Sequence, residues 1–326
     1  MPKTLTRNRL LSSTLTLFLT LFLFAAAAGC ADTATPSNPD LPTVDRAGHL
    51  INAPTEVNAI ISMAPSMTLI LIDLGLGDKI VAMDSQSAAL VAPNPPIPVF
   101  DMLNPNAESL AALKPDLILA SAISMMGNEA NDPFALLQQL NICVAYIPTS
   151  ESIAGIMEDI RFIAAITRQN DQGEKLITEM EREIDEIVRL REQNGSQDQS
   201  GQDQRGQSKT VYFEISAAPY MYSFGKGVFT NEMLELAGGV NIFADQDDWL
   251  PVEAESVLAA NPDVIFTNVD YLDDPVGEIM ARPGWEEVNA VKNARVFYVD
   301  TTSTAVPHHK ITKGIRAMAE LLRESL

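Results

Sequence analysis

The chain has 326 residues, and its 22 Lys and Arg residues stand against 43 Asp and Glu residues, a formal net charge of −21. This excess of negative charge excludes nucleic acid as a partner, because the phosphate backbone repels it. With 46% hydrophobic and only 20% charged residues, the sequence is long and apolar enough for about two packed domains, and general disorder is excluded.

The first 29 residues have the pattern of a secretory signal. Lys3, Arg7 and Arg9 precede an apolar run, 10–28, which ends in small residues just before Cys30. This arrangement resembles a bacterial lipobox, in which the cysteine is lipidated and the chain is cut before it. An uncleaved transmembrane anchor is the alternative, since the run could span about 30 Å of hydrocarbon. Its Ser and Thr residues and its small-residue end favour a lipoprotein signal peptide over residues 1–29.

The segment after the signal sequence is expected to be a tether, and residues 30–43 contain three prolines and few apolar residues. Such a segment is flexible and would connect a lipid on Cys30 to the folded protein. The other cysteine, Cys143, lies in an apolar run and is most simply a small buried side chain. With two cysteines and no zinc-type Cys/His spacing, a disulfide scaffold and a structural zinc site are excluded.

An internal repeat predicts the fold class. Residues 108–121 (ESLAALKPDLILAS) match residues 255–268 (ESVLAANPDVIFTN) at an offset of 147 residues, with six identities in fourteen. Each copy has the pattern of a short helix, a Pro-Asp turn and a continuous apolar strand. Fully apolar strands suit a parallel sheet covered on both faces, so we expect two α/β lobes, residues 44–150 and 209–326.

The predicted lobes are joined by a helical segment, residues 151–193. Within it, the apolar residues recur at helical spacing, which predicts one long amphipathic helix over about 172–191: Leu176, Ile177, Met180, Ile184, Ile187 and Val188. Its charged residues are expected to form a solvated face. Residues 194–208 are rich in Gly, Gln, Ser and Asp and contain no apolar residue, which predicts a disordered surface loop. Further strands are expected near 59–62, 80–83, 144–147, 211–215 and 296–299.

The chain resembles the periplasmic-binding proteins for iron-siderophores, haem and cobalamin. The resemblance runs from about Val44 to Leu322 and is carried by several ordered segments: 44–84, the two repeats, 224–243 (FGKGVFTNEMLELAGGVNIF) and 289–300 (NAVKNARVFYVD). It implies the class III periplasmic-binding fold, in which two Rossmann-like lobes are joined by one long helix and ligand lies in the cleft between them. The sequence pattern alone had already indicated two α/β lobes and a connecting helix.

The resemblance also implies a docking role for two glutamates. In this family one glutamate on each lobe contacts arginines of the membrane permease, and the matching positions are Glu108 and Glu255, which the repeat makes equivalent. Two carboxylates, one per lobe, would give a two-point charge-assisted grip on a dimeric permease. Taken alone, a glutamate early in a helix is explained by the helix dipole.

Candidate ligand contacts follow from the rule that ligands of open α/β sheets bind beyond the carboxyl ends of the strands. The loops in question are 63–66, 122–128, 217–226 and 302–310, with Trp249 nearby. They offer apolar and aromatic side chains that suit a large, partly flat ligand, although some are expected to pack in the core instead. The candidates are Met63, Pro65, Ser66, Met125, Met126, Tyr220, Tyr222, Phe224, Trp249, His308 and His309.

The C-terminal candidates bear on the kind of ligand. Where the family often has an Arg-Pro pair, this chain has Val306-Pro307, and the loss of that arginine disfavours a carboxylate-rich or catecholate siderophore. Adjacent residues of an extended segment point to opposite sides, so at most one of His308 and His309 can face a ligand. Axial ligation of a haem iron or cobalt and a plain surface or helix-start role both remain open. A direct metal site needs three or more protein ligands and is not expected.

The predicted function is the extracytoplasmic binding component of an ABC importer, without enzymatic activity. It would capture a cobalamin or ferric siderophore, less readily haem, and deliver it to a permease dimer with a cytoplasmic ATPase. It needs no cofactor of its own, although the ligand carries iron or cobalt. The protein is expected to be a monomer, lipid-anchored through Cys30 in the periplasm or on the outer face of the cytoplasmic membrane. An adhesin or signalling module on the same fold is the alternative, and an envelope enzyme is disfavoured because no GxSxG or HExxH motif is present.

Overall fold

The computed structural model describes residues 41–122, 134–196 and 208–325, within one compact unit that begins at Leu41. In this part of the chain no helix combines the length and the apolar character needed to cross a bilayer. The predicted signal peptide, Cys30, Met125 and Met126 all lie outside the described residues, and their roles stay predictions.

The N-terminal lobe is built on a five-stranded sheet in the order β3-β2-β1-β4-β5, in which every pairing is parallel. All but the edge strand β3 are almost wholly buried, as expected of a parallel sheet covered on both faces. The elements are β1 (Ile60–Met63), α2 (Pro65–Leu71), β2 (Ile80–Asp84), α3 (Ser85–Val91), β3 (Val99–Phe100), α4 (Ala107–Ala112), β4 (Leu117–Ser121), α5 (Ala135–Gln139) and β5 (Cys143–Ile147).

The C-terminal lobe repeats this plan with a four-stranded parallel sheet in the order β11-β10-β6-β8. A separate antiparallel pair, β7 with β9, forms a two-stranded ribbon. The elements are β6 (Lys209–Glu214), β7 (Tyr222–Phe224), α8 (Phe229–Ala237), β8 (Gly239–Asn241), β9 (Trp249–Pro251), α9 (Ala254–Ala260), β10 (Val264–Thr267), α10 (Pro275–Met280), α11 (Asn289–Lys292), β11 (Val296–Tyr298), α12 (Thr301–Ala305) and α13 (Ile311–Glu324).

The two copies of the sequence repeat fold into the same unit, α4-turn-β4 and α9-turn-β10. Lys114 and Asn261, which occupy equivalent positions in the two turns, both adopt left-handed backbone angles, with φ of 50° and 47°. In each turn an aspartate carboxylate accepts the backbone N–H of a residue near the start of the neighbouring strand: Asp116 from Asn58 at 2.7 Å, and Asp263 from Thr210 at 3.1 Å. The Pro-Asp pair therefore sets the register between each repeat strand and its neighbour.

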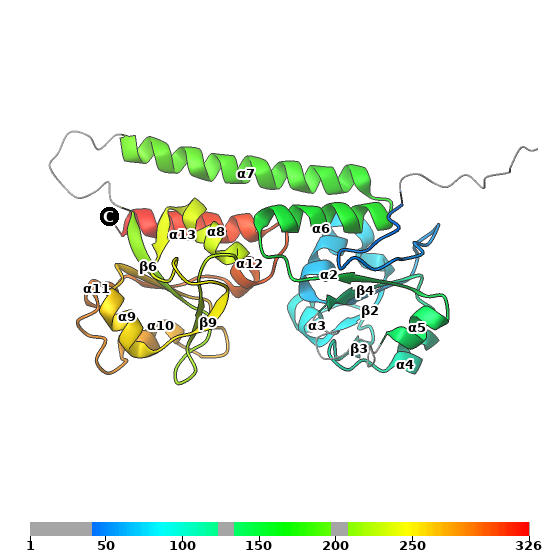
Figure 1. Cartoon of the computed structure of the whole chain (residues 1–326), viewed down its shortest axis with the longest axis horizontal. Coiled ribbons are helices and arrows are strands. Elements are labelled where there is room, and N and C mark those ends of the chain that lie inside the picture. Colours follow the sequence, from blue (N-terminus) through cyan, green and yellow to red (C-terminus); the bar gives the residue numbers. More distant parts are fainter. Residues whose placement is uncertain (1–40, 123–133, 197–207, 326) are drawn as a thin grey trace, which may run out of the picture. The chain divides into compact units, whose positions relative to one another are not determined.

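Two helices connect the sheets. Ser152 caps α6 (Ile153–Ile166) through a bond from the Gly155 N–H, and α7 (Asn170–Ser196) then runs beside α6 and, farther along, beside α8 and α13 (Figure 1). The predicted long helix is confirmed, but it continues to Ser196. The start of the predicted loop, at 194, was therefore placed too early, because weak helix formers continue a helix that is already nucleated and packed. Residues 197–207 lie outside the described residues.

One continuous cluster of buried apolar side chains includes residues of both lobes and of the connecting helices, such as Ile60, Ile163, Ile187 and Phe213. A polar contact also joins the connecting helices to the C-terminal lobe, since the Ile153 N–H at the start of α6 donates to Glu232 Oε2 at 2.8 Å. The sheets are therefore parts of one packed body, and the edges of both are available for a site.

Candidate functional site

In each sheet the strands are all parallel, so their carboxyl ends lie along one edge, where open α/β sheets bind ligands. The carboxyl-end edge of the N-terminal lobe, at Met63, Asp84 and Ser121, is called the N-terminal edge. The carboxyl-end edge of the C-terminal lobe, at Glu214, Thr267 and Tyr298, is called the C-terminal edge. The two edges differ in chemistry.

The N-terminal edge is closed by a buried polar network. The Thr68 hydroxyl lies 2.7 Å from Ser62 Oγ and 3.0 Å from Ser87 Oγ, and the Ser87 hydroxyl in turn donates to the Asp84 carboxylate. Asp84 also caps α3 by accepting the backbone N–H groups of Gln86 and Ser87 at 2.9 and 3.0 Å. Because these groups are buried and satisfy one another, they fix the starts of α2 and α3 and offer no free donor to a ligand.

Among the predicted contacts on this edge, Pro65 and Ser66 lie half-buried in the first turn of α2. Met63 is completely buried and packs with Ile61 and Ile118 in the core. Phe224, in the other lobe, is also completely buried. The prediction that Met63 and Phe224 line a ligand surface is therefore wrong, because both side chains project from their strands into the apolar interior.

The C-terminal edge exposes aromatic rings. In the β7–β9 ribbon Tyr222 is paired with Pro251 and Phe224 with Trp249, which places Tyr222 and Trp249 on the same face. They are 41% and 42% exposed, and the Trp249 ring packs edge-on over buried Phe224 with ring centroids 5.8 Å apart. Tyr220, in the loop before the ribbon, is 81% exposed. These three predicted contacts are therefore accessible.

Two further aromatic residues at this edge were missed by the sequence reasoning. Tyr271 follows β10 and is 63% exposed, and Tyr298 ends β11 and is 44% exposed. The rule that placed the other loops beyond strand ends would have found Tyr271, had it been applied to the loop after the second repeat. In the part of the chain that the structure describes, all of the exposed aromatic side chains belong to the C-terminal lobe.

The adjacent histidines, His308 and His309, do not face this edge. His309 Nε2 lies 2.8 Å from Asp73 Oδ2, and Lys310 Nζ lies 2.5 Å from the same oxygen, so this segment contacts the N-terminal lobe just after α2. The His308 Nδ1 donates to the Val306 carbonyl at 2.9 Å. Both rings are buried. Their predicted contact with ligand is therefore wrong, and the helix-start alternative describes them correctly, since α13 begins at Ile311.

Burial dominates the electrostatics of this cluster. It lowers the pKa of His308 to about 4 and, against the attraction of Asp73, also lowers the pKa of His309. Burial raises the pKa of Asp73, but the hydrogen bond from Lys310 and the nearby positive charge lower it by more, so that the pKa lies below its usual range. Among the described residues no group of three or more His, Cys, Asp or Glu side chains is arranged to hold a metal ion.

Glu108 and Glu255 are both exposed, and each lies in the first turn of its helix, α4 and α9. The structure therefore places these glutamates on equivalent and accessible positions of the repeat.

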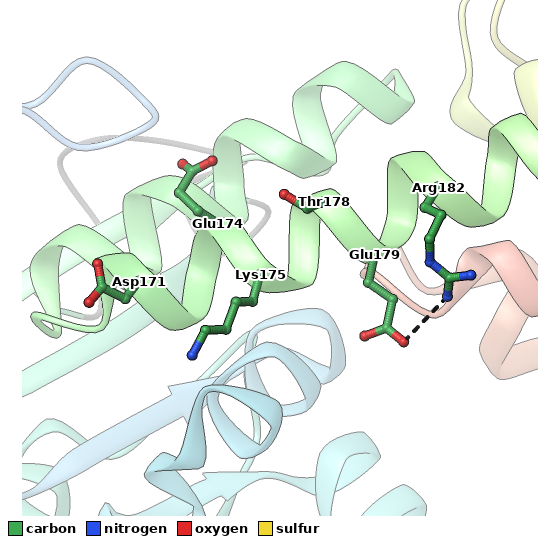
Figure 2. Close-up of a pocket in the computed structure, with 6 residues that line it drawn as sticks. All are labelled: Asp171, Glu174, Lys175, Thr178, Glu179 and Arg182. Carbon is green, nitrogen blue, oxygen red and sulfur yellow. Dashed lines mark ion pairs between the residues drawn. The ribbon is translucent and has the colours of Figure 1, made fainter.

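A shallow hollow of about 550 Å³ lies along α7, away from both edges (Figure 2). Its lining is charged and exposed: Asp171, Glu174, Lys175, Thr178, Glu179 and Arg182. Figure 2 shows Glu174 on one side of the helix, and Glu179 and Arg182, 3.9 Å apart, on the other. Because one helix supplies every lining residue and no apolar group converges there, we favour the C-terminal edge as the ligand site.

The two parallel sheets, the repeated α-turn-β unit and the long connecting helix define a class III periplasmic-binding fold. Residues 60–302 match the model of the periplasmic binding protein family. The chain therefore belongs to the periplasmic binding protein family.

Three proteins show how close the relationship is. An uncharacterized ABC transporter substrate-binding lipoprotein of Bacillus subtilis, YvrC, is 30% identical over 85% of this chain and 84% of its own length. A vitamin B12-binding protein of Vibrio cholerae is 29% identical over 76% of this chain and 83% of its own. The crystal structure of a possible iron-binding protein from Staphylococcus epidermidis is 29% identical, with a TM-score of 0.65 over 82% of this chain and 99% of that one. The relatives from Bacillus subtilis and Vibrio cholerae are named as binding proteins, the first as an ABC transporter substrate-binding lipoprotein.

Proposed function

We propose that this protein is the extracytoplasmic ligand-binding component of an ABC importer for a bulky metal chelate or corrinoid. The ligand is bound against the C-terminal edge, with cobalamin first among the candidates, a ferric siderophore second and haem third. The iron or cobalt arrives with the ligand, and the protein acts as a carrier and not as an enzyme. The observation that carries the proposal is the exposure of five aromatic side chains at or beyond the C-terminal edge: Tyr220, Tyr222, Trp249, Tyr271 and Tyr298.

The physical argument for a bulky ligand rests on these exposed aromatic side chains. Exposed aromatic side chains are costly to leave in water and gain free energy when a large apolar or planar surface covers them. Around Trp249 the charge is mixed, since Lys226 Nζ lies 3.5 Å from Asp247 Oδ1. A neutral ligand suits this surface better than a polyanionic one. The vitamin B12-binding and possible iron-binding relatives support the same ligand class.

Membrane attachment and delivery belong to the same proposal. Cys30 carries a lipid that holds the protein outside the cytoplasmic membrane, which the lipoprotein relative from Bacillus subtilis supports. Glu108 and Glu255 dock on the permease, one from each lobe. Their exposure and their equivalent positions on α4 and α9 support this assignment.

The experiment begins with the absorbance spectrum and mass of whatever co-purifies, followed by calorimetric titration with cyanocobalamin, haemin and a ferric hydroxamate. Trp249→Ala removes the ring from the face that it shares with Tyr222, and we expect affinity to fall about 10- to 100-fold. The matched control is Leu140→Ala, which removes a side chain that is 55% exposed on the N-terminal lobe. Failure of all three compounds to bind the wild type would contradict the proposal, as would equal affinity of Trp249→Ala.

A further inference from the structure

The loop that presents Tyr220, residues 215–221, is held at both ends by one buried arginine. Arg282 Nη1 and Nη2 donate to Glu214 Oε2 and Oε1 at 2.9 and 3.2 Å, a two-pronged contact with the residue just before the loop. Arg282 Nη1 also lies 3.1 Å from the sulfur of Met221, the last residue of the loop. The arginine therefore fixes the distance between the two ends of the loop.

Arg282 is itself held firmly. Its side chain is only 8% exposed, Nε donates to Glu278 Oε1 at 3.2 Å, and the guanidinium lies 4.4 Å from the centre of the Trp285 ring. Burial lowers the pKa of Arg282, but hydrogen bonds to Glu214 and Glu278 raise it by more, so the guanidinium stays charged. A buried guanidinium with two carboxylate partners can therefore act as a rigid support for the loop.

The middle of the loop has a second support. The backbone N–H of Ala217 donates to the hydroxyl of Tyr271 at 2.8 Å, and Ser216 Oγ lies 3.4 Å from the same hydroxyl. The Ile215 N–H closes the base of the loop by donating to the Tyr222 carbonyl at 2.9 Å. The loop is thus connected to the segment just after α10, to the segment after β10 and to β7 before any ligand arrives.

We propose that Arg282 and Tyr271 are positioning residues, which hold loop 215–221 so that Tyr220 and Tyr222 are presented to ligand in a fixed arrangement. The inference rests on the proposed function, because it assigns the loop to the binding edge. A loop that is already ordered does not have to be ordered on binding, so the fixed arrangement increases affinity. Arg282 acts through Met221 and Glu214 and does not itself contact the ligand.

The N-terminal lobe offers a matched control. Arg46 also has two acidic partners, with Nη1 2.8 Å from Glu158 and Nε 2.7 Å from Asp159. This second network connects the start of the folded chain to α6, and none of the three residues belongs to a loop at either edge. Replacing an arginine by lysine keeps the charge but removes the fork of donors, which at Arg282 holds both oxygens of Glu214 and at Arg46 reaches two separate carboxylates. The same substitution can therefore be compared at both sites.

The experiment measures hydrogen exchange over residues 215–222 and titrates cyanocobalamin, haemin and a ferric hydroxamate into Tyr271→Phe, Arg282→Lys and Arg46→Lys. We expect faster exchange in this segment and about 10-fold weaker binding for Tyr271→Phe and Arg282→Lys, and neither effect for Arg46→Lys. Tyr271→Phe removes only a hydroxyl from an exposed ring, so its result stands even if Arg282→Lys fails to fold.

Three results would overturn the inference: unchanged exchange in Tyr271→Phe, faster exchange with unchanged affinity, or equal loss of affinity in Arg46→Lys. We expect only tyrosine at position 271 to give wild-type protection from exchange and wild-type affinity. A wild-type protein that binds none of the three probes would contradict the proposed function. The exchange measurement would then still decide whether the two residues hold the loop.

Discussion

The two lobes share one structural unit but present different chemistry at their carboxyl edges. In the N-terminal lobe, Ser62, Thr68, Asp84 and Ser87 bond to one another and are buried. In the C-terminal lobe the corresponding edge exposes tyrosine and tryptophan rings. The difference teaches that the repeat supplies a framework, whereas the loops and the added β7–β9 ribbon supply the exposed aromatic side chains of the proposed site, in line with the general independence of fold and function.

The first prediction tests what the lobes have in common. Glu108→Ala and Glu255→Ala should each weaken association with the permease by a similar amount, because the two glutamates occupy equivalent first turns. Truncating one partner of a well-formed interfacial ion pair costs about 2 to 5 kcal/mol, so the double variant should lose nearly all binding in a pull-down.

The control for this prediction is Glu56→Ala, which removes another exposed carboxylate of the N-terminal lobe. Ligand affinity in solution should stay at the wild-type value in all of these variants. Raised salt should weaken the association in part, because exposed charges are screened within about 8 to 10 Å at physiological ionic strength. Undiminished permease binding by the double variant would show that the glutamates serve only their helices.

The shared framework was largely predictable from the sequence, and the reason lies in the repeat. The runs 117–121 and 264–267 are continuous and apolar, and each follows a Pro-Asp turn, so local pattern and buried position agree. The same agreement applies to β1, β2, β5, β6 and β11, whose predicted positions differ from the observed ones by one or two residues. Parallel strands carry this signal because both of their faces are buried.

The site was less predictable, because its geometry depends on contacts between distant residues. The β7–β9 ribbon consists of two three-residue strands separated by α8 and β8, too short for a period-two pattern to be recognised. The histidines were misplaced since α12 intervenes after β11, and their segment then contacts Asp73, a residue 236 positions from His309. No local sequence pattern predicts a contact between residues so far apart in the chain.

The second prediction concerns the buried His308, next to the contact between the lobes, and the dependence of stability on pH. The folded pKa of His308 is about 4, against an ordinary value of 6.5. As the pH falls below 6.5, His308 becomes protonated in the unfolded chain but stays neutral in the folded chain. The free energy of unfolding therefore decreases until the pH reaches about 4. At about 1.4 kcal/mol per pKa unit, the loss attributable to His308 is about 3 kcal/mol.

This prediction is checked by urea unfolding at pH 7 and pH 4.5 for the wild type and His308→Gln, which cannot titrate. The variant should lose clearly less stability between the two pH values. Carboxylates such as Asp73 and Glu214 titrate in both proteins, so their contributions cancel in the comparison. Equal losses in the two proteins would show that His308 is protonated in the folded state, which contradicts the burial argument.

The third prediction tests the difference between the edges. Thr68→Val keeps the shape of the side chain but removes the hydroxyl that joins Ser62 and Ser87. The two serine hydroxyls would lose a buried partner, at a cost of about 1 to 2 kcal/mol in the free energy of unfolding. Ligand affinity should change little, because the network is buried. Trp249→Ala should weaken ligand binding as well as lower stability, because its ring packs over buried Phe224. A Thr68→Val protein with wild-type stability and weak ligand binding would contradict this division of roles.

The smallest effect is expected where the chain passes from one lobe to the other. Before residue 197 the end of α7 is already attached to the C-terminal lobe, because Arg191 Nη1 donates to the carbonyls of Glu235 and Leu236 at 3.0 and 3.2 Å, and Ile187 is buried.

The sequence 197–207 has no apolar residue to bury. Replacing it with Gly and Ser at equal length should therefore change the free energy of unfolding by less than about 0.5 kcal/mol. Arg191→Ala, by contrast, should cost about 1 kcal/mol, since it removes a side-chain donor from two carbonyls at the end of α8, of which Glu235 keeps the Gly238 N–H at 3.0 Å. Thermal melts of both variants make the comparison, and a loss of several degrees in the Gly-Ser variant alone would show that the segment, and not Arg191, holds α7 to the lobe.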